Sequence, residues 1–514
     1  MAHGYLRGLT STPRSESYEG RFGRMFRALQ PGSYGTDTEG NLTELGLAME
    51  AKLDDPFDGQ DPEESGIPAL YTYFGQFIDH DLTLGPEGSF QKVKDVDALV
   101  DFRTPAFDLD CVYGRGPDDQ PYLYEKDGKT LLTGKPIKGG SADKAFDLPR
   151  NGADPARALI GDPRNDENTI VSQLQGLFLA FHNRLIAEDP NVTFERAQRK
   201  TIRHYQYVVL NDFLPSIVDS GVLKQLKSGD LYDVHKLKYY HPKNRPFMPV
   251  EFSTAAYRFG HSMIRPGYRL NDDNLLAIFA ATKEQDLRGK YAMAENRGMD
   301  WGRIIDTDLR AYDGADKSSD QMKRLQFAYR IDASLVNPLS RLPDNVVGNK
   351  PISLAQRNLL RSVQLGLPTG QAVARAMHLE PLKDEQIIIQ KAVDSSKIDK
   401  KDLIKPIADI ANGAFKNNCP LWTYILAEAA VHQTPVTIKR LGGDVTMTTP
   451  RLGPVGGRMV AEVFLGIMFG DPTSLLRTNP SWTPASGADY RLRDFVLYAT
   501  GKVIPAEIGK GAGR

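Results

Sequence analysis

Cysteine is nearly absent from this chain of 514 residues, which contains only Cys111 and Cys419. Two thiols cannot form a disulfide framework for a chain of this length, nor a zinc site by themselves. The cysteine content therefore does not indicate whether the protein works in an oxidising or a reducing compartment. An excess of charge of one sign is also lacking, because 64 basic and 65 acidic residues give a formal net charge of −1. This balance argues against a nucleic-acid partner, which would require a concentrated positive field.

Long apolar runs are missing as well. The longest apolar stretches, around Leu174–Leu185 and Val460–Phe469, are interrupted by polar residues and are too short to cross a bilayer. The first twenty residues (MAHGYLRGLTSTPRSESYEG) have no apolar core of the kind found in signal peptides. We therefore expect no membrane span and no recognised signal peptide, and a protein that is cytoplasmic or exported by a non-classical route.

The chain divides by composition into two parts. Residues 1–65 are rich in Gly, Ser, Pro and Arg and predict an irregular N-terminal arm, whereas residues 66–514 predict one large domain. Apolar residues in the second part recur mostly at helical spacing. The helices expected from this spacing are Ile170–Glu188, Ala197–Val218, Pro351–Gly366, Cys419–Val431 and Gly456–Phe469. Short strands are expected near Tyr122–Leu132 and Val436–Thr449, so the predicted fold is mainly α.

The stretch Leu70–Leu84 (LYTYFGQFIDHDLTL) concentrates polar residues on an otherwise apolar segment. Gln76 and His80 stand four residues apart and share one face of a helix. Asp79 and Asp81 flank the histidine. A lone histidine on an amphipathic helix is usually structural, so this stretch by itself leaves both a structural and a catalytic interpretation open.

Two further segments have the same ambiguity. In GDPRNDE, Arg164 and Glu167 stand three residues apart and can face one cavity, or can form only an acidic helix start with a nearby ion pair. In AYRFGHSMIRP, Gly260 would let a flat ligand approach the backbone beside His261, and Arg258 could reach an anionic group. Alone, His261 could equally be an ordinary buried histidine.

Taken together, these segments resemble the animal haem peroxidases. GQFIDHDLT, GDPRNDE and AYRFGHSMIRP occur in the order of that family's motifs, and Asn358 and Arg361 resemble its Asn-x-x-Arg segment before Gly-Leu-Pro. The resemblance runs over roughly residues 65–480. It implies a single large helical haem-peroxidase domain with few short strands.

The resemblance assigns one face of a haem b to the third and fourth segments. His261 is implied as the proximal ligand of the haem iron. Asn358 is implied to accept a hydrogen bond from the other ring nitrogen and so to orient the ligand. Arg258 and Arg361 are implied to contact the haem periphery and its propionates, which suit planar cationic groups.

The opposite face of the haem is assigned to the first two segments. His80 is implied as the general acid–base for hydrogen peroxide, and Arg164 as the group that stabilises negative charge when the O–O bond breaks. Gln76 is implied to hold a distal water or a small anion. Asp79 and Glu167 occupy the positions at which the family forms two ester bonds to its haem.

The expected electron donors follow from one position at which this sequence differs from some members of the family. Asn168 stands where some members of the family carry a methionine that makes an additional link to the haem. Without that link, we expect iodide, bromide, thiocyanate or phenolic donors rather than chloride, each oxidised at the expense of hydrogen peroxide. The oligomeric state is not indicated by the sequence.

A calcium site is also implied by the resemblance. The loop TPAFDLD matches the family's calcium loop through Thr104, Ala106 (by its carbonyl), Asp108 and Asp110, and Asp81 would complete the site. Several oxygen donors with multiple carboxylates suit a hard cation such as Ca²⁺. Because Asp81 follows His80 directly, the ion would brace the distal helix.

Three other functions would require different residues at these positions. A fatty-acid dioxygenase or cyclooxygenase-like enzyme would carry a radical-forming tyrosine three residues before the proximal histidine, and that position is Arg258. A non-catalytic haem-binding adhesion or matrix protein would be expected to lose His80 or Arg164. A non-haem metal hydrolase would need a His-x-x-x-His or Cys/His spacing, which is missing.

Overall fold

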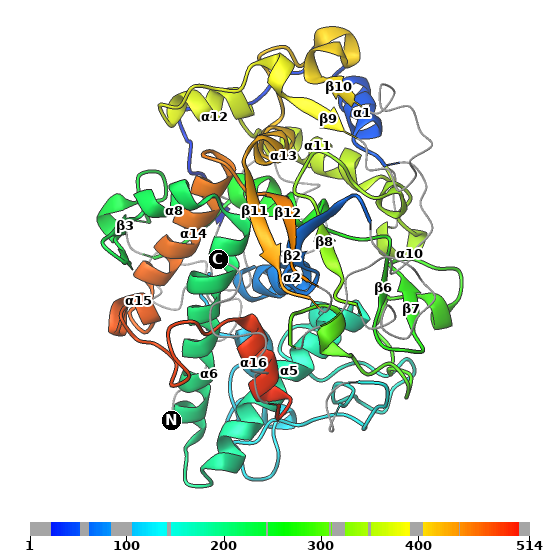
Figure 1. Ribbon diagram of the computed structural model, residues 1–514, viewed down its shortest axis with the longest axis vertical. Helices are drawn as coiled ribbons and strands as arrows, with labels where there is room; N and C mark the ends of the chain where they lie inside the picture. The colour runs from blue at the N-terminus through cyan, green and yellow to red at the C-terminus, as the bar shows by residue number, and fades with distance from the viewer. Residues whose placement is uncertain are drawn as a thin grey trace.

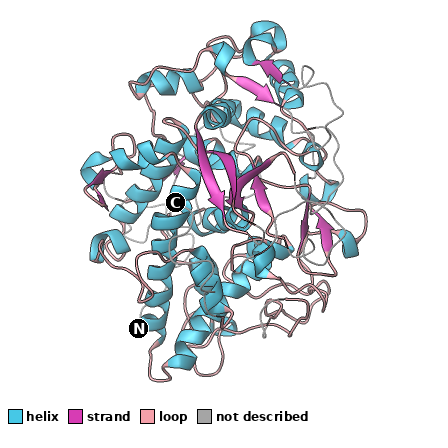
Figure 2. Cartoon of the chain, in the orientation of Figure 1, coloured by secondary structure: helices cyan, strands magenta, loops and turns pink. Residues whose placement is uncertain are grey.

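The computed structural model describes residues 22–51, 61–83, 105–140, 145–242, 245–307, 310, 324–347, 351–390, 404–440 and 443–502. Helices dominate this part of the chain, and the strands are short and pair only two at a time (Figures 1 and 2). The predicted mainly α fold is therefore confirmed. No helix among these residues is long and apolar enough to cross a membrane.

The helices vary from a single turn to twenty residues. They are α1 (Thr38–Ala48), α2 (Leu70–Leu82), α4 (Asp110–Tyr113), α5 (Thr169–Glu188), α6 (Phe194–Val208), α7 (Leu214–Ile217), α8 (Ser220–Gln225), α9 (Val250–Thr254), α10 (Asp344–Val347), α11 (Leu354–Gln364), α12 (Gly370–Ala376), α13 (Leu421–Val431), α14 (Gly456–Gly470), α15 (Leu475–Thr478) and α16 (Leu492–Ala499).

The strands form six two-stranded pairs among the described residues. The pairs are β1 (Phe22–Gly23) with β5 (Met248–Pro249), β2 (Glu64–Pro68) with β8 (Phe327–Tyr329), β3 (Lys227–Ser228) with β4 (Leu231–Tyr232), β6 (Gly267–Arg269) with β7 (Leu275–Ala277), β9 (Ile388–Gln390) with β10 (Ile404–Pro406), and β11 (Gln433–Ile438) with β12 (Val445–Pro450).

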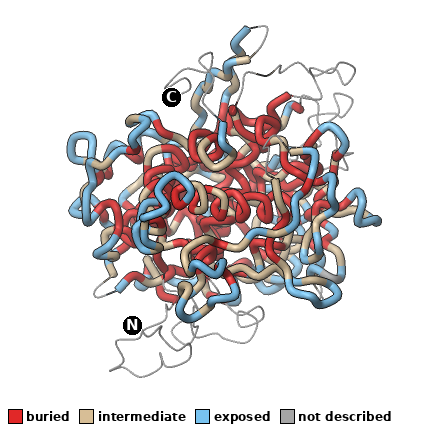
Figure 3. The backbone as a smooth tube through the Cα atoms, turned by 90° about the horizontal axis from the view of Figure 1, so that it is seen from below, coloured by how far each residue is buried: buried red, intermediate tan, exposed pale blue. Residues whose placement is uncertain are grey.

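Helix α5 is the longest helix of the described chain and lies in the core, in contact with α2, α6 and α16. Asn168 caps its first turn, because the side-chain oxygen accepts a hydrogen bond from the backbone N–H of Val171 at 2.9 Å. Most of its residues are buried, which accords with the broad apolar stripe in its sequence. Figure 3 shows buried segments gathered in the interior and exposed ones at the rim.

The predicted helix Ala197–Val218 is confirmed with an interruption. Helix α6 starts three residues earlier than predicted, where the side chain of Thr193 caps it by accepting from the N–H of Arg196 at 3.3 Å. A π-helical segment, Val209–Phe213, then leads into α7. The expected helices at α5, α11, α13 and α14 are confirmed within a few residues of their predicted ends.

Of the two regions predicted to form strands, one forms a hairpin and the other forms only a single bridge. Val436–Thr449 lies in the β11–β12 hairpin, which packs against β2. The short strand expected near Tyr122–Leu132 is present only as an isolated antiparallel bridge between Tyr124 and Leu131, which follows a 3₁₀ turn. Two backbone hydrogen bonds flank this bridge, from Glu125 to Thr130 at 2.7 Å and from Leu132 to Leu123 at 3.0 Å.

The N-terminal arm is not irregular throughout. Within residues 22–51, helix α1 forms where the sequence analysis expected no periodic element, and it packs against α11. Its first turn is capped by Asp37, which accepts from the N–H of Gly40 at 3.0 Å, and Leu42 and Leu45 are buried. Residues 1–21 lie outside the described part, and the boundary near residue 65 stays a prediction.

A buried group of ion pairs links the segment before α2 to the segment that follows His261. Glu64 of β2 accepts from Arg265 at 2.6 Å and from Arg324 at 2.8 Å, and all three side chains are almost fully buried. Glu64 lies shortly before α2, and Arg265 lies four residues after His261. The pairing therefore fixes the start of the distal helix against the proximal segment.

Candidate active site

Helix α2 is buried on nearly all sides, and its accessible residues are confined to one face. Gly75, Gln76 and Asp79 are half-buried, whereas the other residues of the helix are buried. Positions 75, 76 and 79 fall on one side of an α-helix. Gln76 and Asp79, two of the polar residues predicted to carry chemistry, therefore occupy the partly accessible face of α2.

His80 is buried and held by a residue that the sequence analysis did not single out. Its Nδ1 lies 2.7 Å from Oδ1 of Asn165, and the amide nitrogen of Asn165 donates to Gln175 at 2.8 Å. Because Asn165 presents its acceptor oxygen, Nδ1 carries the ring proton and Nε2 keeps its lone pair. Nε2 lies 3.7 Å from the carboxylate of Glu167. His80 is thus oriented as a base toward the accessible side of α2.

Burial, and then the charge of Arg164, lower the pKa of His80 below its ordinary value of 6.5. The neutral imidazole is favoured, because a low-polarity environment and a neighbouring cation both oppose a second proton. At neutral pH His80 is therefore unprotonated at Nε2 and can accept a proton there.

Arg164 holds the end of the distal helix. Its guanidinium pairs with the buried carboxylate of Asp162 at 2.7 Å, and it donates to the backbone carbonyl of His80 at 3.1 Å and to that of Thr83. These bonds also satisfy carbonyl groups at the C-terminus of α2 that the helix leaves without partners. The structure places Arg164 beside His80, as predicted, but anchored by Asp162.

Gln76 and Glu167 meet directly. The amide nitrogen of Gln76 donates to Oε1 of Glu167, and its oxygen accepts from Asn168 at 3.3 Å. About a third of the Glu167 side chain is accessible, so its carboxylate faces space. The distal residues predicted from separate sequence motifs therefore form one cluster with His80.

The proximal residues form a second cluster. The amide nitrogen of Asn358 lies 2.8 Å from Nδ1 of His261. The predicted role of Asn358, accepting a proton from Nδ1, needs its amide turned by 180°, which leaves Nε2 free to bind a metal. Burial, followed by the charges of Arg258 and Arg361, lowers the pKa of His261 to about 3. The neutral form that ligates metals is thus strongly favoured.

Positive charge gathers around His261. Burial, together with the neighbouring Arg258 and Arg357, lowers the pKa of Arg361 to about 10. Arg258 is half-buried, and its Nε donates to the carbonyl of Ser253 at 2.9 Å. Because these guanidinium groups lie close together and are partly shielded from water, they favour binding of an anionic group such as a carboxylate.

The elements that carry the two clusters, α2 and the 3₁₀ segment Ala256–His261, are in contact. The hydroxyl of Tyr257 donates to the carbonyl of Gly75 at 3.2 Å. At Gly260, an added Cβ would meet no heavy atom within 4 Å. The partly accessible face of α2, the neutral His261 with its neighbouring arginines and the open space at Gly260 fit a flat cofactor with acidic groups.

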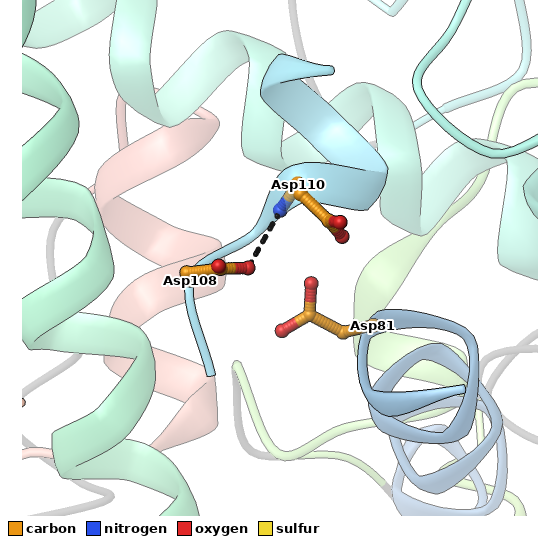
Figure 4. Close-up of side chains that lie close together, drawn as sticks. All are labelled: Asp81, Asp108 and Asp110. Atoms are coloured by element: carbon orange, nitrogen blue, oxygen red, sulfur yellow. Dashed lines mark hydrogen bonds between the residues drawn. The ribbon is translucent and has the colours of Figure 1, made fainter. Parts of the chain in front are cut away.

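Three carboxylates converge beside His80. Asp81, Asp108 and Asp110 each offer an oxygen, and these oxygens all lie within 4.8 Å of one another (Figure 4). Leu109, between the two loop residues, adopts a left-handed backbone conformation with φ 58°, and its N–H donates to Asp81 at 3.4 Å. Ala106 is buried in the same loop, and Thr104 lies outside the described residues.

The sequence profile of the animal haem peroxidases matches residues 92–400, which is more than half of the chain. The chain belongs to this family. The matched region contains Arg164, Glu167, His261 and Asn358, whereas His80 and the rest of α2 precede it. Membership of this family implies that the chain binds haem, because the family is defined by that cofactor.

Known proteins agree with this assignment. Chorion peroxidase of Aedes aegypti is 32% identical over 117 residues, which are 21% of this chain and 15% of that protein. The solved structure of peroxidase A from Dictyostelium discoideum covers 99% of both chains with a TM-score of 0.56 and 15% identity. A fatty acid alpha-dioxygenase of Oryza sativa covers 96% of this chain and 81% of its own, with a TM-score of 0.50 and 17% identity. At these identities the solved structures show a shared fold, and the chain spans only a small part of the first curated relative.

Proposed function

We propose that this protein is a haem-dependent peroxidase that reduces hydrogen peroxide and oxidises iodide, bromide, thiocyanate or phenolic donors. The observation that carries the proposal is the orientation of His80. It is a buried neutral base, fixed by Asn165, on the helix that contacts the segment ending at His261. A dioxygenase is not favoured, because the position three residues before His261 is Arg258.

The residues present fit a haem. His261 would hold the iron through Nε2, and Arg258 and Arg361 would pair with the propionates. Haem, when bound, supplies an iron that accepts peroxide as a ligand and takes up its two oxidising equivalents.

The proton transfers belong to the chain itself. His80 would take a proton of hydrogen peroxide at Nε2 and return it to the departing oxygen, so that water rather than hydroxide leaves. Arg164, fixed by Asp162, stabilises the negative charge that develops as the O–O bond breaks, with no reorganisation at that moment. Gln76 positions a water or small anion on the same side.

The lowered pKa of His80 predicts a flat pH profile near neutrality. The rate of reaction with peroxide stays constant from neutral pH to below 6.5, the ordinary histidine pKa, and falls only when His80 becomes protonated. Asn165→Asp places a carboxylate against Nδ1, favours the imidazolium and moves this acid limb upward by about one pH unit or more. Stopped-flow mixing with peroxide across pH measures both.

The control for this profile is Asn191→Asp, which makes the same charge change at an exposed position. Its acid limb should coincide with that of the unmodified protein. An acid limb that stays in place in Asn165→Asp, or that is missing in both proteins, contradicts the assignment of His80 as the base.

Two ester bonds to haem are proposed at Asp79 and Glu167, whose carboxyl groups lie on the accessible side of the distal cluster. Acid–acetone should leave haem on the unmodified protein and extract it from an Asp79→Ala, Glu167→Ala double variant. Glu195→Gln, an exposed change on α6, serves as the matched control and should retain the haem. Complete extraction from the unmodified protein would contradict the ester bonds while leaving peroxide reactivity unaffected.

Calcium is proposed as the occupant of the Asp81, Asp108 and Asp110 cluster, because converging carboxylates repel one another until a hard cation joins them. Added Ca²⁺ should raise the unfolding free energy by about 2.7 kcal/mol at a concentration 100 times the dissociation constant. Asp108→Asn should reduce this gain, whereas the exposed Asp118→Asn should not. Differential scanning fluorimetry with Ca²⁺ and with chelator tests this; an unfolding temperature that is the same in both would contradict it.

A further inference from the structure

A continuous file of aromatic rings leads away from the distal helix. Phe77, which follows Gln76 on α2, stacks on Phe178 of α5 with ring centroids 4.5 Å apart and an interplanar angle of 7°. Phe178 contacts Phe495 of α16 at 4.7 Å, and Phe495 stacks on Phe181 at 4.1 Å and 3°. Figure 1 shows α16 beside α5, and α5 also contacts α2.

The file ends at a tyrosine near the surface. The ring of Phe181 lies 4.7 Å from that of Tyr498, which is half-buried. The hydroxyl of Tyr498 donates to the exposed carboxylate of Glu188 at 2.6 Å. Arg184 also binds Glu188, at 2.8 Å, and its guanidinium lies 4.3 Å above the Tyr498 ring.

This arrangement supplies what one-electron oxidation of a phenol requires. A phenol that loses an electron becomes a strong acid and needs a base within hydrogen-bond reach. Burial raises the pKa of Glu188, but the hydrogen bonds from Tyr498 and Arg184 and the charge of Arg184 together outweigh it and lower the pKa below its ordinary value. Glu188 is therefore an ionised acceptor at neutral pH, in direct contact with the phenol.

We propose that Tyr498 is a second oxidation site, at which the enzyme removes hydrogen atoms from phenolic side chains of other polypeptides that are too large to reach the buried cluster around His80. This inference rests on the proposed peroxidase function, which supplies the oxidant.

The reaction balances in electrons and protons. Tyr498 gives one electron through the ring file toward the distal cluster and its phenolic proton to Glu188, leaving a neutral tyrosyl radical. A donor tyrosine then transfers one hydrogen atom to this radical, which restores Tyr498, and Glu188 releases its proton. Two such cycles provide the two electrons and two protons that convert hydrogen peroxide to two waters. The two donor radicals join in one carbon–carbon bond.

Aromatic stacking also occurs as ordinary core packing. Core packing alone does not account for the hydrogen-bonded pair of the Tyr498 phenol and the Glu188 carboxylate at the outer end of the file. A branch reaches the half-buried Trp482 through His204, with ring centroids 5.3 Å from Phe181 to His204 and 5.1 Å from His204 to Trp482. Trp482 is thus the competing exit for the oxidising equivalent.

The test uses the haem-loaded full chain treated with hydrogen peroxide and a nitroso spin trap. Peptide mass spectrometry locates the trapped radical, which we expect on Tyr498. Oxidation of tyrosine coupled to polymer beads is measured beside oxidation of iodide. In Tyr498→Phe the adduct at this position disappears and bead oxidation falls at least roughly tenfold, the scale on which a positioned proton-transfer group acts, while iodide oxidation is unchanged.

Two further variants sharpen the test. Glu188→Gln keeps the phenol and removes the base, so it should lower the yield of the Tyr498 adduct and bead oxidation together. Tyr122→Phe alters a tyrosine that is 52% exposed and away from the ring file, and it should change neither.

The outcomes separate the two proposals. An adduct on Trp482 with none on Tyr498, or undiminished bead oxidation in Tyr498→Phe, overturns the Tyr498 site while peroxidase activity stands. A haem-loaded protein that does not react with peroxide and does not oxidise iodide overturns both.

Discussion

Replacing His261 with glycine should abolish normal haem ligation. His261 lies beside both an open space, at Gly260, and a cationic cluster of Arg258 and Arg361. Its neutral imidazole would supply the bond to iron, and an axial bond of this kind determines the spectrum of a haem protein. We expect the purified variant to lose most of its haem, or to hold haem with a shifted Soret band, and to lose its reaction with peroxide.

Free imidazole provides the control for this variant. The cavity left by His261→Gly can admit imidazole, which should restore the Soret band toward that of the unmodified protein. The exposed His235→Ala should change neither haem content nor spectrum. A His261→Gly protein with an unchanged spectrum and full peroxide reactivity would show that the proximal assignment is wrong.

Replacing His80 with alanine should leave haem bound but slow its reaction with peroxide. Positioned general acid–base groups typically contribute roughly 10²–10⁴-fold in rate. Because the proposed role of His80 includes proton transfer both from and to the peroxide, we expect a loss toward the upper end of that range. Rapid mixing of the haem-loaded variant with peroxide measures it directly.

The pattern of loss distinguishes a chemical role from a structural one. His182→Gln alters another buried histidine, which contacts the hydroxyl of Tyr113 and the carbonyl of Lys129 away from the distal cluster. It should affect stability more than the peroxide rate. If His80→Ala retains full peroxide reactivity, or loses no more than His182→Gln, the acid–base role is contradicted.

The sequence predicted the core helices because burial imposes a helical period on their apolar residues. It also placed His80, Arg164 and His261 in motifs that the fold brings together. Helix α1 was missed because its capping residue Asp37 stands in a Gly-rich stretch that resembles a loop. Its stability depends on packing against α11, which local sequence does not reveal.

The residues that orient the site could not be predicted in the same way. Asn165 reaches Nδ1 of His80 across 85 positions of sequence, and Asp162 sets Arg164 against the end of α2. The only local signal was that of ordinary turn residues, since Asp162 also accepts from the N–H of Arg164 at 2.8 Å. Their second role appears only when α2 and the 3₁₀ segment Pro163–Asp166 meet.

The central claim is that His80 and His261 enclose a haem that reacts with peroxide. An absorption spectrum of the purified protein, recorded before and after one equivalent of hydrogen peroxide, tests it most directly. The account predicts a Soret band that changes on addition of peroxide and returns when iodide is added. A haem-reconstituted protein that shows no Soret band, or a band that peroxide does not change, would contradict it.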